Sequence, residues 1–353
     1  MAKQETQKLD NIIASRCAML LGGGAALVAL AMPSAAKAAV TVTTFTDADI
    51  LNFALNLEYL EANFYYLAAF GCTINAPNAA AIAAGAPSGG IGIGAGTTTT
   101  GTAATTGGAT AVPFLDARVK SYAIETAIEE GKHVLFLRNA LVSAAVAQPA
   151  IDVSTVAFTK VANAAGIAGT FNPYSSDAFF LVGAYIFEDV GVTAYHGAAP
   201  LITTGSTGKT YLQAAAGILA VEAYHAGLIR TTINALDPNN ALGYITYTQQ
   251  ISNLRATLSK AVAPTASGNP NMPTFPTTTY GDDVPLTINA TDSLAGATAL
   301  PATTIANADQ TNVIAFSRTT TQVLNIVTGG GAATVGTKAT GVFFPSGLNG
   351  TFV

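Results

Sequence analysis

Glu130-Gly-Lys-His133 and Glu222-Ala-Tyr-His225 are the two stretches that decide the fold, because each places a histidine three residues after a glutamate. Residues three apart in an α-helix lie on one face about one turn apart, so such a pair can bind a single metal ion together. The 353 residues include only three histidines, and two of them fall in this motif. The motif therefore predicts two helices that share a metal site.

Two further segments of helical length each contribute a glutamate. One Glu from each of two helices, with one Glu-x-x-His from each of two others, is the ligand set of a two-metal carboxylate site in a four-helix bundle. Residues 179–201 and 211–229 are otherwise almost without charge, and uncompensated carboxylates are costly to bury. We therefore expect six ligands for two iron (or manganese) ions, namely Glu58, Glu130, His133, Glu188, Glu222 and His225.

Neighbouring acids leave the choice of ligand open on the first two of these helices. Glu61 follows Glu58 by one turn, and either carboxylate can face the core. Glu125 and Glu129 precede Glu130, and Glu129 is also within about one turn of His133. A solvated acidic face is the simpler interpretation of Glu125 and Glu129, so the pair Glu130–His133 is preferred.

Other polar side chains near the predicted ligands have simpler interpretations. Asp189 points about 100° away from Glu188 on a helix and is the weaker ligand candidate. His196 lies two turns beyond Glu188 and suits a capping or core role better than a ligand role. Tyr65 shares a stripe with Glu58 and is the candidate catalytic residue. Three other tyrosines either donate hydrogen bonds to the ligands or fill the core, namely Tyr185, Tyr195 and Tyr224.

The composition indicates a compact protein that forms a core. Half of the residues are hydrophobic, 10% are charged and the formal net charge is −5. The sequence shows no cluster of Lys and Arg, which argues against electrostatic binding of nucleic acid.

The first 38 residues read as an export signal. Basic residues precede an apolar stretch at 17–32, and Ala36-x-Ala38 is a small-residue cleavage site. The alternative is a membrane anchor that stays attached, but the apolar stretch is short for a spanning helix and contains three consecutive glycines. We expect a periplasmic, cell-surface or extracellular protein with no membrane span after cleavage.

The remaining chain divides into a helical domain at 39–263 and an extension at 264–353 packed on it. A Gly/Ala/Thr-rich insertion at 73–112 has no periodicity and reads as surface. Connection lengths favour two antiparallel helix hairpins joined by one long crossover. The helices are expected at 47–70, 114–145, 176–199 and 210–236, with a short helix near 153–164, a fifth at 244–262 and a helical stretch at 309–327.

Two phrases around the lone glutamates resemble the bacterial and plant ferritin-like family that includes desiccation-related proteins. They are Asn56-Leu-Glu-Tyr-Leu-Glu-Ala-Asn-Phe-Tyr65 and Phe187-Glu-Asp-Val-Gly-Val-Thr-Ala-Tyr195. Residues 316–327 and 344–350 are similar to that family's tail. In the ferritin-like superfamily the first ligand Glu is followed seven residues later by Tyr, a relation that favours Glu58 over Glu61. The resemblance implies an all-α fold: a ferritin-like four-helix bundle with one long crossover, a fifth helix and a loop-rich C-terminal wrap.

Two functions follow as hypotheses. The first is an exported di-iron (or manganese) carboxylate protein whose metals bind dioxygen or peroxide, and which oxidises iron or removes peroxide to protect the envelope. The second is a structural or desiccation-protective envelope protein that keeps the bundle without turnover. Its low charge, Thr/Gly insertion and apolar tail would suit packing against other copies in a homo-oligomer.

Overall fold

A computed structural model of the chain describes residues 45–92, 98–99, 111–261, 283–286, 305–308, 313–331 and 338–352. The expected export signal at 1–38 lies outside the described residues, as does much of the Gly/Thr-rich insertion. The described residues are mostly helical, with only two short strands, which confirms the all-α class.

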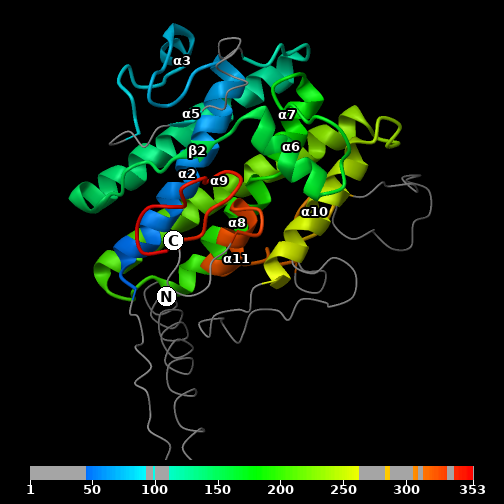
Figure 1. The fold of residues 1–353 in the computed structure, drawn as a ribbon. Helices are drawn as coiled ribbons and strands as arrows, with labels where there is room; N and C mark the ends of the chain where they lie inside the picture. The colour runs from blue at the N-terminus through cyan, green and yellow to red at the C-terminus, as the bar shows by residue number, and fades with distance from the viewer. Residues whose placement is uncertain are drawn as a thin grey trace, which may run out of the picture. The chain divides into compact units, whose positions relative to one another are not determined.

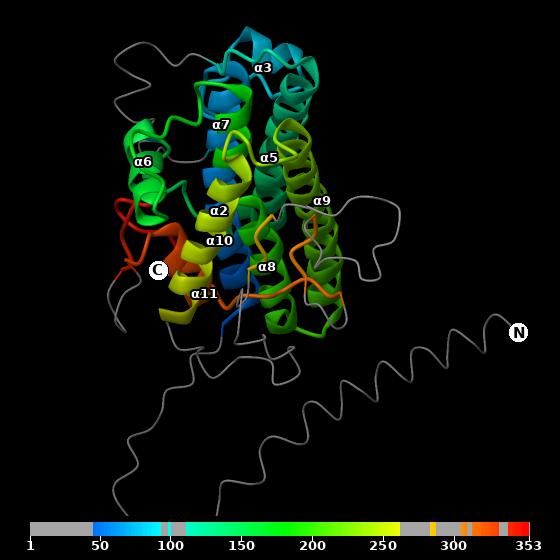
Figure 2. The same ribbon diagram turned by 90° about the vertical axis from the view of Figure 1, so that its right-hand side faces the viewer.

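Four long helical segments run side by side and form a bundle (Figures 1 and 2). Helix α2 packs chiefly against α5, and α8 packs chiefly against α9. The crossover between these two pairs holds a 3-10 helix η1 (Val142–Ala144), strand β2 (Ile151–Asp152) and helix α6 (Thr155–Ala164). The expected bundle with one long crossover is therefore confirmed. Its long segments are α2 (Asp47–Phe70), α5 (Ala117–Leu141), α7 (Asp177–Ala184) continued by α8 (Glu188–Ala198) and η2 (Ala199–Leu201), and α9 (Ser206–Leu236).

Helix α2 begins and ends at the predicted residues. Thr46 forms a capping box with Asp49, and Gly71 ends the helix with a φ of 68°, a conformation that favours glycine. Nearly every residue between them is buried, because other elements cover α2 on all sides. Burial therefore does not distinguish Glu58 from Glu61, which are both inside the protein.

The helix expected at 176–199 is interrupted. At Tyr185–Phe187 the backbone makes turns in which Ile186 and Phe187 N–H groups donate to carbonyls three residues back. The Tyr185 carbonyl accepts a hydrogen bond from Arg255 Nη1 at 2.6 Å. The break places Glu188 and Asp189 in the first turn of α8, where the helix dipole favours negative charge.

Part of the insertion packs on the bundle rather than lying wholly on the surface. Helix α3 (Ala79–Ala83) follows α2, and strand β1 (Thr98–Thr99) pairs in parallel with β2. Ile74, Ala81 and Ile91 are buried. The absence of periodicity hid these contacts, because single apolar residues in loops leave no repeating pattern.

The described parts of the C-terminal extension lie against the bundle. Helix α10 (Tyr244–Ala261) was expected, whereas α11 (Thr320–Val327) is shorter than the stretch expected at 309–327. Residues 313–319 are not helical, and residues 309–312 lie outside the described residues. The Phe343 ring contacts Phe158 and Phe187. The Asn56 side-chain amide donates to the Asn349 carbonyl oxygen at 2.8 Å, and the Asn349 backbone N–H donates to Asn56 Oδ1 at 3.0 Å.

Two helical stretches, Asp177–Leu201 and Ser206–Leu236, are long and apolar enough to cross a membrane by length and composition alone. In the first, 89% of the most apolar window is buried inside the protein, compared with 33% in the second. Burial in the bundle core accounts for the apolarity of the first stretch.

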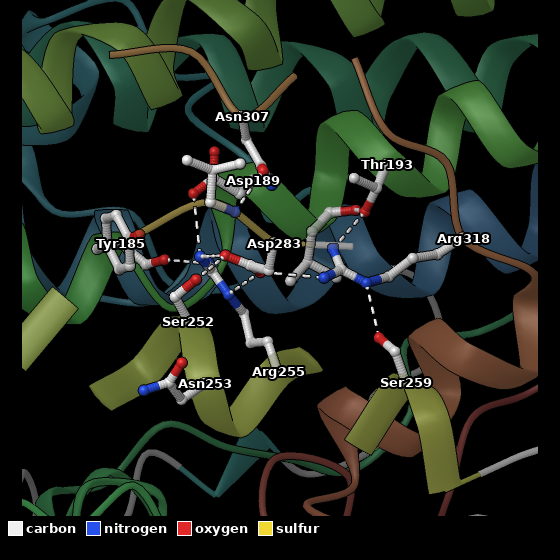
Figure 3. Close-up of polar contacts among 12 residues, drawn as sticks. Tyr185, Asp189, Thr193, Ser252, Asn253, Arg255, Ser259, Asp283, Asn307 and Arg318 are labelled. Carbon is white, nitrogen blue, oxygen red and sulfur yellow. Dashed lines mark hydrogen bonds and ion pairs between the residues drawn. The ribbon is translucent and has the colours of Figure 1, made fainter. Parts of the chain in front are cut away.

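A buried network of arginines and aspartates joins α8 to the extension (Figure 3). Asp189 binds Arg230 of α9 at 2.6 Å and Arg255 of α10 at 3.0 Å. Asp283 in turn binds Arg255 at 2.7 Å and Arg318 at 3.0 Å. All five side chains are almost fully buried, so each charge needs its partners.

Replacing Asp283 with alanine should destabilise the protein strongly, because Arg255 and Arg318 would both lose a buried anionic partner. Removing one member of a buried ion pair costs about 3–5 kcal/mol. Arg118→Ala is the matched control, since Arg118 pairs with Asp116 through a side chain that is 79% exposed, and exposed pairs contribute little. Denaturant unfolding measures both variants. Equal free energies of unfolding would contradict the role given to Asp283.

Candidate metal centre

The structure brings all six predicted ligands together in the core of the bundle. Glu58 comes from α2, Glu130 and His133 from α5, Glu188 from α8, and Glu222 and His225 from α9. Their donor atoms form two overlapping sets, each with all atoms within 4.8 Å of one another. One set is Glu58, Glu130, His133 and Glu222, and the other is Glu130, Glu188, Glu222 and His225.

The two sets have related geometries. His133 Nδ1 lies 3.2 Å from Glu58 Oε2 and 3.5 Å from Glu222 Oε1. On the other side, His225 Nδ1 lies 3.1 Å from Glu130 Oε1 and 3.3 Å from Glu188 Oε2. Glu130 and Glu222 belong to both sets and stand where bridging carboxylates would, whereas Glu58 and Glu188 each belong to one set.

The unsatisfied atoms of the centre fit a pair of metal ions. Both oxygens of Glu130 and Glu222, one oxygen each of Glu58 and Glu188, and the Nδ1 atoms of both histidines are buried without a hydrogen-bond partner. Buried polar atoms are nearly always paired. These six carboxylate oxygens and two imidazole nitrogens therefore need a partner that they can share, and a metal cation is such a partner. Carboxylate and imidazole donors in this number suit two divalent transition-metal ions.

Two tyrosines hold the outer oxygens of the carboxylates that serve one set each. The Tyr65 hydroxyl donates to Glu188 Oε1, and the Tyr195 hydroxyl donates to Glu58 Oε1. The contacts cross between helices, since each tyrosine follows one glutamate by seven residues and binds the other. That seven-residue spacing is the sequence signal for Tyr195 as well as for Tyr65, although Tyr195 shares its residue type and helical setting with Tyr185 and Tyr224.

Glu129 has a defined position beside the centre instead of facing solvent only. Its Oε2 lies 2.8 Å from His225 Nε2, and its side chain is 37% exposed. A carboxylate on the outer nitrogen fixes the orientation of a histidine ligand and leaves Nδ1 facing the metal position. The sequence offered both a ligand and a surface interpretation of Glu129; the structure leaves it out of both donor sets and places it partly in solvent, in contact with His225.

Glu61 is a fifth buried carboxylate next to the six expected ligands, although it belongs to neither donor set. Gly191 on α8 leaves the space between Glu61 and Glu222. A Cβ atom at Gly191 would lie 2.5 Å from Glu222 Oε2 and 3.5 Å from Glu61 Oε1. The glycine inside this helix, which costs about 1 kcal/mol relative to alanine, therefore makes room for the carboxylates.

The other polar residues near the ligands in sequence lie apart from the centre. Asp189 belongs to the arginine network, and His196 Nδ1 lies 3.2 Å from the Phe316 carbonyl oxygen. Glu125 is exposed. Tyr224 is 74% exposed, and the Tyr185 ring lies beneath two arginines of the network.

A comparison with known families assigns the bundle. The family described as "Ferritin-like domain" matches residues 46–235, which include all six predicted ligands. The chain belongs to this ferritin-like family. It is also 30% identical over 217 residues to the desiccation-related protein PCC13-62 of Craterostigma plantagineum. That match covers 60% of this chain and 61% of the relative's own length. No solved structure matches the chain.

Burial and mutual repulsion favour protonation of several carboxyls in the ferritin-like centre. Burial raises the pKa of Glu58 to about 7, with His133 opposing the rise and Glu130 adding to it. Burial, with the charge of Glu130, raises the pKa of Glu222 well above its usual range. Burial and the charge of Glu222 do the same for Glu61. Burial therefore favours the neutral form of these carboxyls unless a cation replaces the proton.

The surroundings of the two histidines and of Glu130 favour the charged form of each side chain. Burial disfavours a charged imidazole, but Glu58 beside His133 and Glu188 beside His225 raise the pKa of each ring. Burial alone would raise the pKa of Glu130, yet the two histidines outweigh it and lower that pKa. Metal ions must displace protons from the imidazoles and from carboxyls with a raised pKa such as Glu58. Metal affinity should therefore increase as the pH rises through about 7.

Replacing Gly191 with alanine should displace the Glu222 carboxylate, because the added Cβ would lie 2.5 Å from its Oε2. We expect metal affinity to fall by roughly 10–100-fold, the range seen when the support of a ligand is removed. Gly227→Ala is the matched control on the same helix bundle, since a Cβ at Gly227 meets nothing within 4 Å. Calorimetric titration with Mn²⁺ measures both variants. Unchanged affinity in Gly191→Ala would contradict the role given to this glycine in placing the Glu222 carboxylate.

Proposed function

We propose that this protein is an exported di-metal carboxylate protein that holds two iron (or manganese) ions and uses them on dioxygen, peroxide or ferrous iron. Protection of the cell envelope against oxidative stress is the role that follows. The observation that carries this proposal is the set of eight buried donor atoms without hydrogen-bond partners. A purely structural core gains nothing from four buried carboxylates, because apolar residues of similar volume would be more stable.

Each residue of the centre has a part in this function. Glu130 and Glu222 hold both metal positions, whereas Glu58 and Glu188 each hold one. The two positions, when loaded, would supply electrons to an oxidant. Tyr65, the candidate catalytic residue, keeps a protonated hydroxyl on Glu188, since burial and the Glu188 charge raise its pKa well above the usual range. The Tyr195 hydroxyl does the same at Glu58.

Metal binding should stabilise the folded protein, and the stabilisation should depend on His225. A ligand that binds only the native state raises stability with its concentration. His225→Ala should lose most of the rise in melting temperature caused by Fe²⁺ or Mn²⁺, while the apolar helix stripes keep it folded. His196→Ala, which removes the histidine outside the centre, should behave like wild type. Thermal melts at about pH 6 and pH 8 decide this, and the rise should be larger at pH 8 because Glu58 has a pKa of about 7.

Turnover is tested on the same three proteins. Anaerobically loaded wild type should bind two ions per chain and consume peroxide or oxidise added ferrous iron, and His225→Ala should lose both properties. If metal raised the melting temperatures of wild type and His225→Ala equally, the metal would not bind at this centre.

A second candidate function is protection without turnover. The Craterostigma relative is a desiccation-related protein, which favours this candidate. A wild-type protein that binds no metal after anaerobic loading would support this candidate over the first.

Export is part of the proposal and rests on the apolar stretch at 17–32 and the site Ala36-x-Ala38. N-terminal sequencing of protein recovered from outside the cytoplasm should find Ala39 as the first residue. An intact Met1 on protein that stays in the cytoplasm would contradict export.

A further inference from the structure

The seam between α5 and α9 is closed at one end and open at the other. The two helices lie next to each other (Figure 2) but make far fewer contacts than α2 and α5 or α8 and α9. At the closed end Glu129 contacts His225. At the other end the helices leave a groove of about 530 Å³, lined by Lys132, His133, Phe136, Thr210, Gln213, Ala214, Gly217, Ile218 and Val221.

His133 connects this groove to the metal centre. Its Nδ1 faces the carboxylates of Glu58 and Glu222, and its ring also lines the groove, with 11% of the side chain exposed. His225 differs, because Glu129 covers its outer nitrogen and only 5% of its side chain is exposed. Of the two metal positions, the one beside His133 is therefore the one next to solvent.

The other cavities near the centre are too small to admit a hydrated ion. One lies behind Glu61 under Ile326 and Val327, another lies beside Tyr195, and each offers about 20 Å³. One water molecule needs about 10–15 Å³ of such volume, so each of these cavities holds one or two waters, fewer than the six around a hydrated divalent cation. Of these three cavities, only the groove has this capacity.

We propose that the groove between α5 and α9 is the entrance through which divalent metal ions reach the centre, and that the position beside His133 fills first. Glu58, Glu130 and Glu222 form one donor set with the His133 imidazole, and their carboxylates would replace the waters of an entering ion. This inference rests on the part of the proposed function that assigns metal binding to the centre.

Lys132 sets the rate at this entrance. It is exposed, precedes His133 in the sequence and is the one charged residue besides His133 among those lining the groove. A positive charge at the rim repels an arriving dication without affecting the donor atoms inside. The groove therefore admits metal ions more slowly than its width alone would allow.

Filling the groove tests the route. Gly217 lines it, and a Cβ there meets nothing within 4 Å, so Gly217→Trp adds a large side chain without displacing others. Gly227→Trp is the matched control: the same helix and the same open surroundings, but about 15 Å away and outside the groove. Stopped-flow absorbance of Co²⁺ uptake by the apo protein should show at least about tenfold slower loading for Gly217→Trp alone, an added barrier of about 1.4 kcal/mol.

Reversing the charge at the rim of the groove tests the same route, but here the loading rate should rise. Lys132→Glu should load Co²⁺ about threefold faster than wild type at low ionic strength, and added salt should reduce the difference. Lys160→Glu makes the same charge change at an exposed residue of α6 and should load at the wild-type rate. Final stoichiometry should be the same in all four variants, since none changes a ligand.

The outcomes separate the route from the function. Equal loading rates for Gly217→Trp and Gly227→Trp, with two ions bound at the end, would overturn the entrance but keep the metal centre. Failure of wild type to bind Co²⁺ at all would overturn the metal centre itself.

Discussion

The cost of burying carboxylates is the constraint on which the rest of this structure depends. Glu58, Glu130, Glu188 and Glu222 are removed from solvent in the middle of the bundle, where repulsion among them adds to the loss of hydration. Two histidines with raised pKa values offset part of that charge. Eight donor atoms still lack partners, and two divalent ions would neutralise four carboxylates.

Adjacent residues on α8 show two solutions to the same problem. Glu188 faces the ferritin-like centre and binds Tyr65, whereas Asp189 faces the other way and binds Arg230 and Arg255. Burial is nearly complete for both side chains. The break before α8 makes the arrangement possible, because it starts a new helix at these two acids and leaves a carbonyl that Arg255 satisfies.

The buried network extends the structural unit beyond the region that matches the family. The ferritin-like match ends at residue 235, yet Asp283 pairs with Arg255, and Arg318 pairs with Asp283 in turn. Arg318 also donates to Thr193 of α8 at 2.8 Å. The extension therefore supports the helix that carries Glu188. The two sides of the centre differ, because the extension covers the α8 side whereas a groove opens between α5 and α9.

Local spacing in the sequence determined the helices and the choice of six candidate ligands, because an i, i+3 pair and an apolar stripe are properties of one helix at a time. The repeated seven-residue spacing at Glu58 and Glu188 also carried the information for Tyr195. Only the tertiary structure decided that α2 has no solvent face, that Glu61 is buried and that Glu129 supports His225. It also decided the break at Tyr185–Phe187 and the link from Asp189 to Asp283. These features depend on contacts between segments far apart in the chain, and no periodic pattern within a single segment records them.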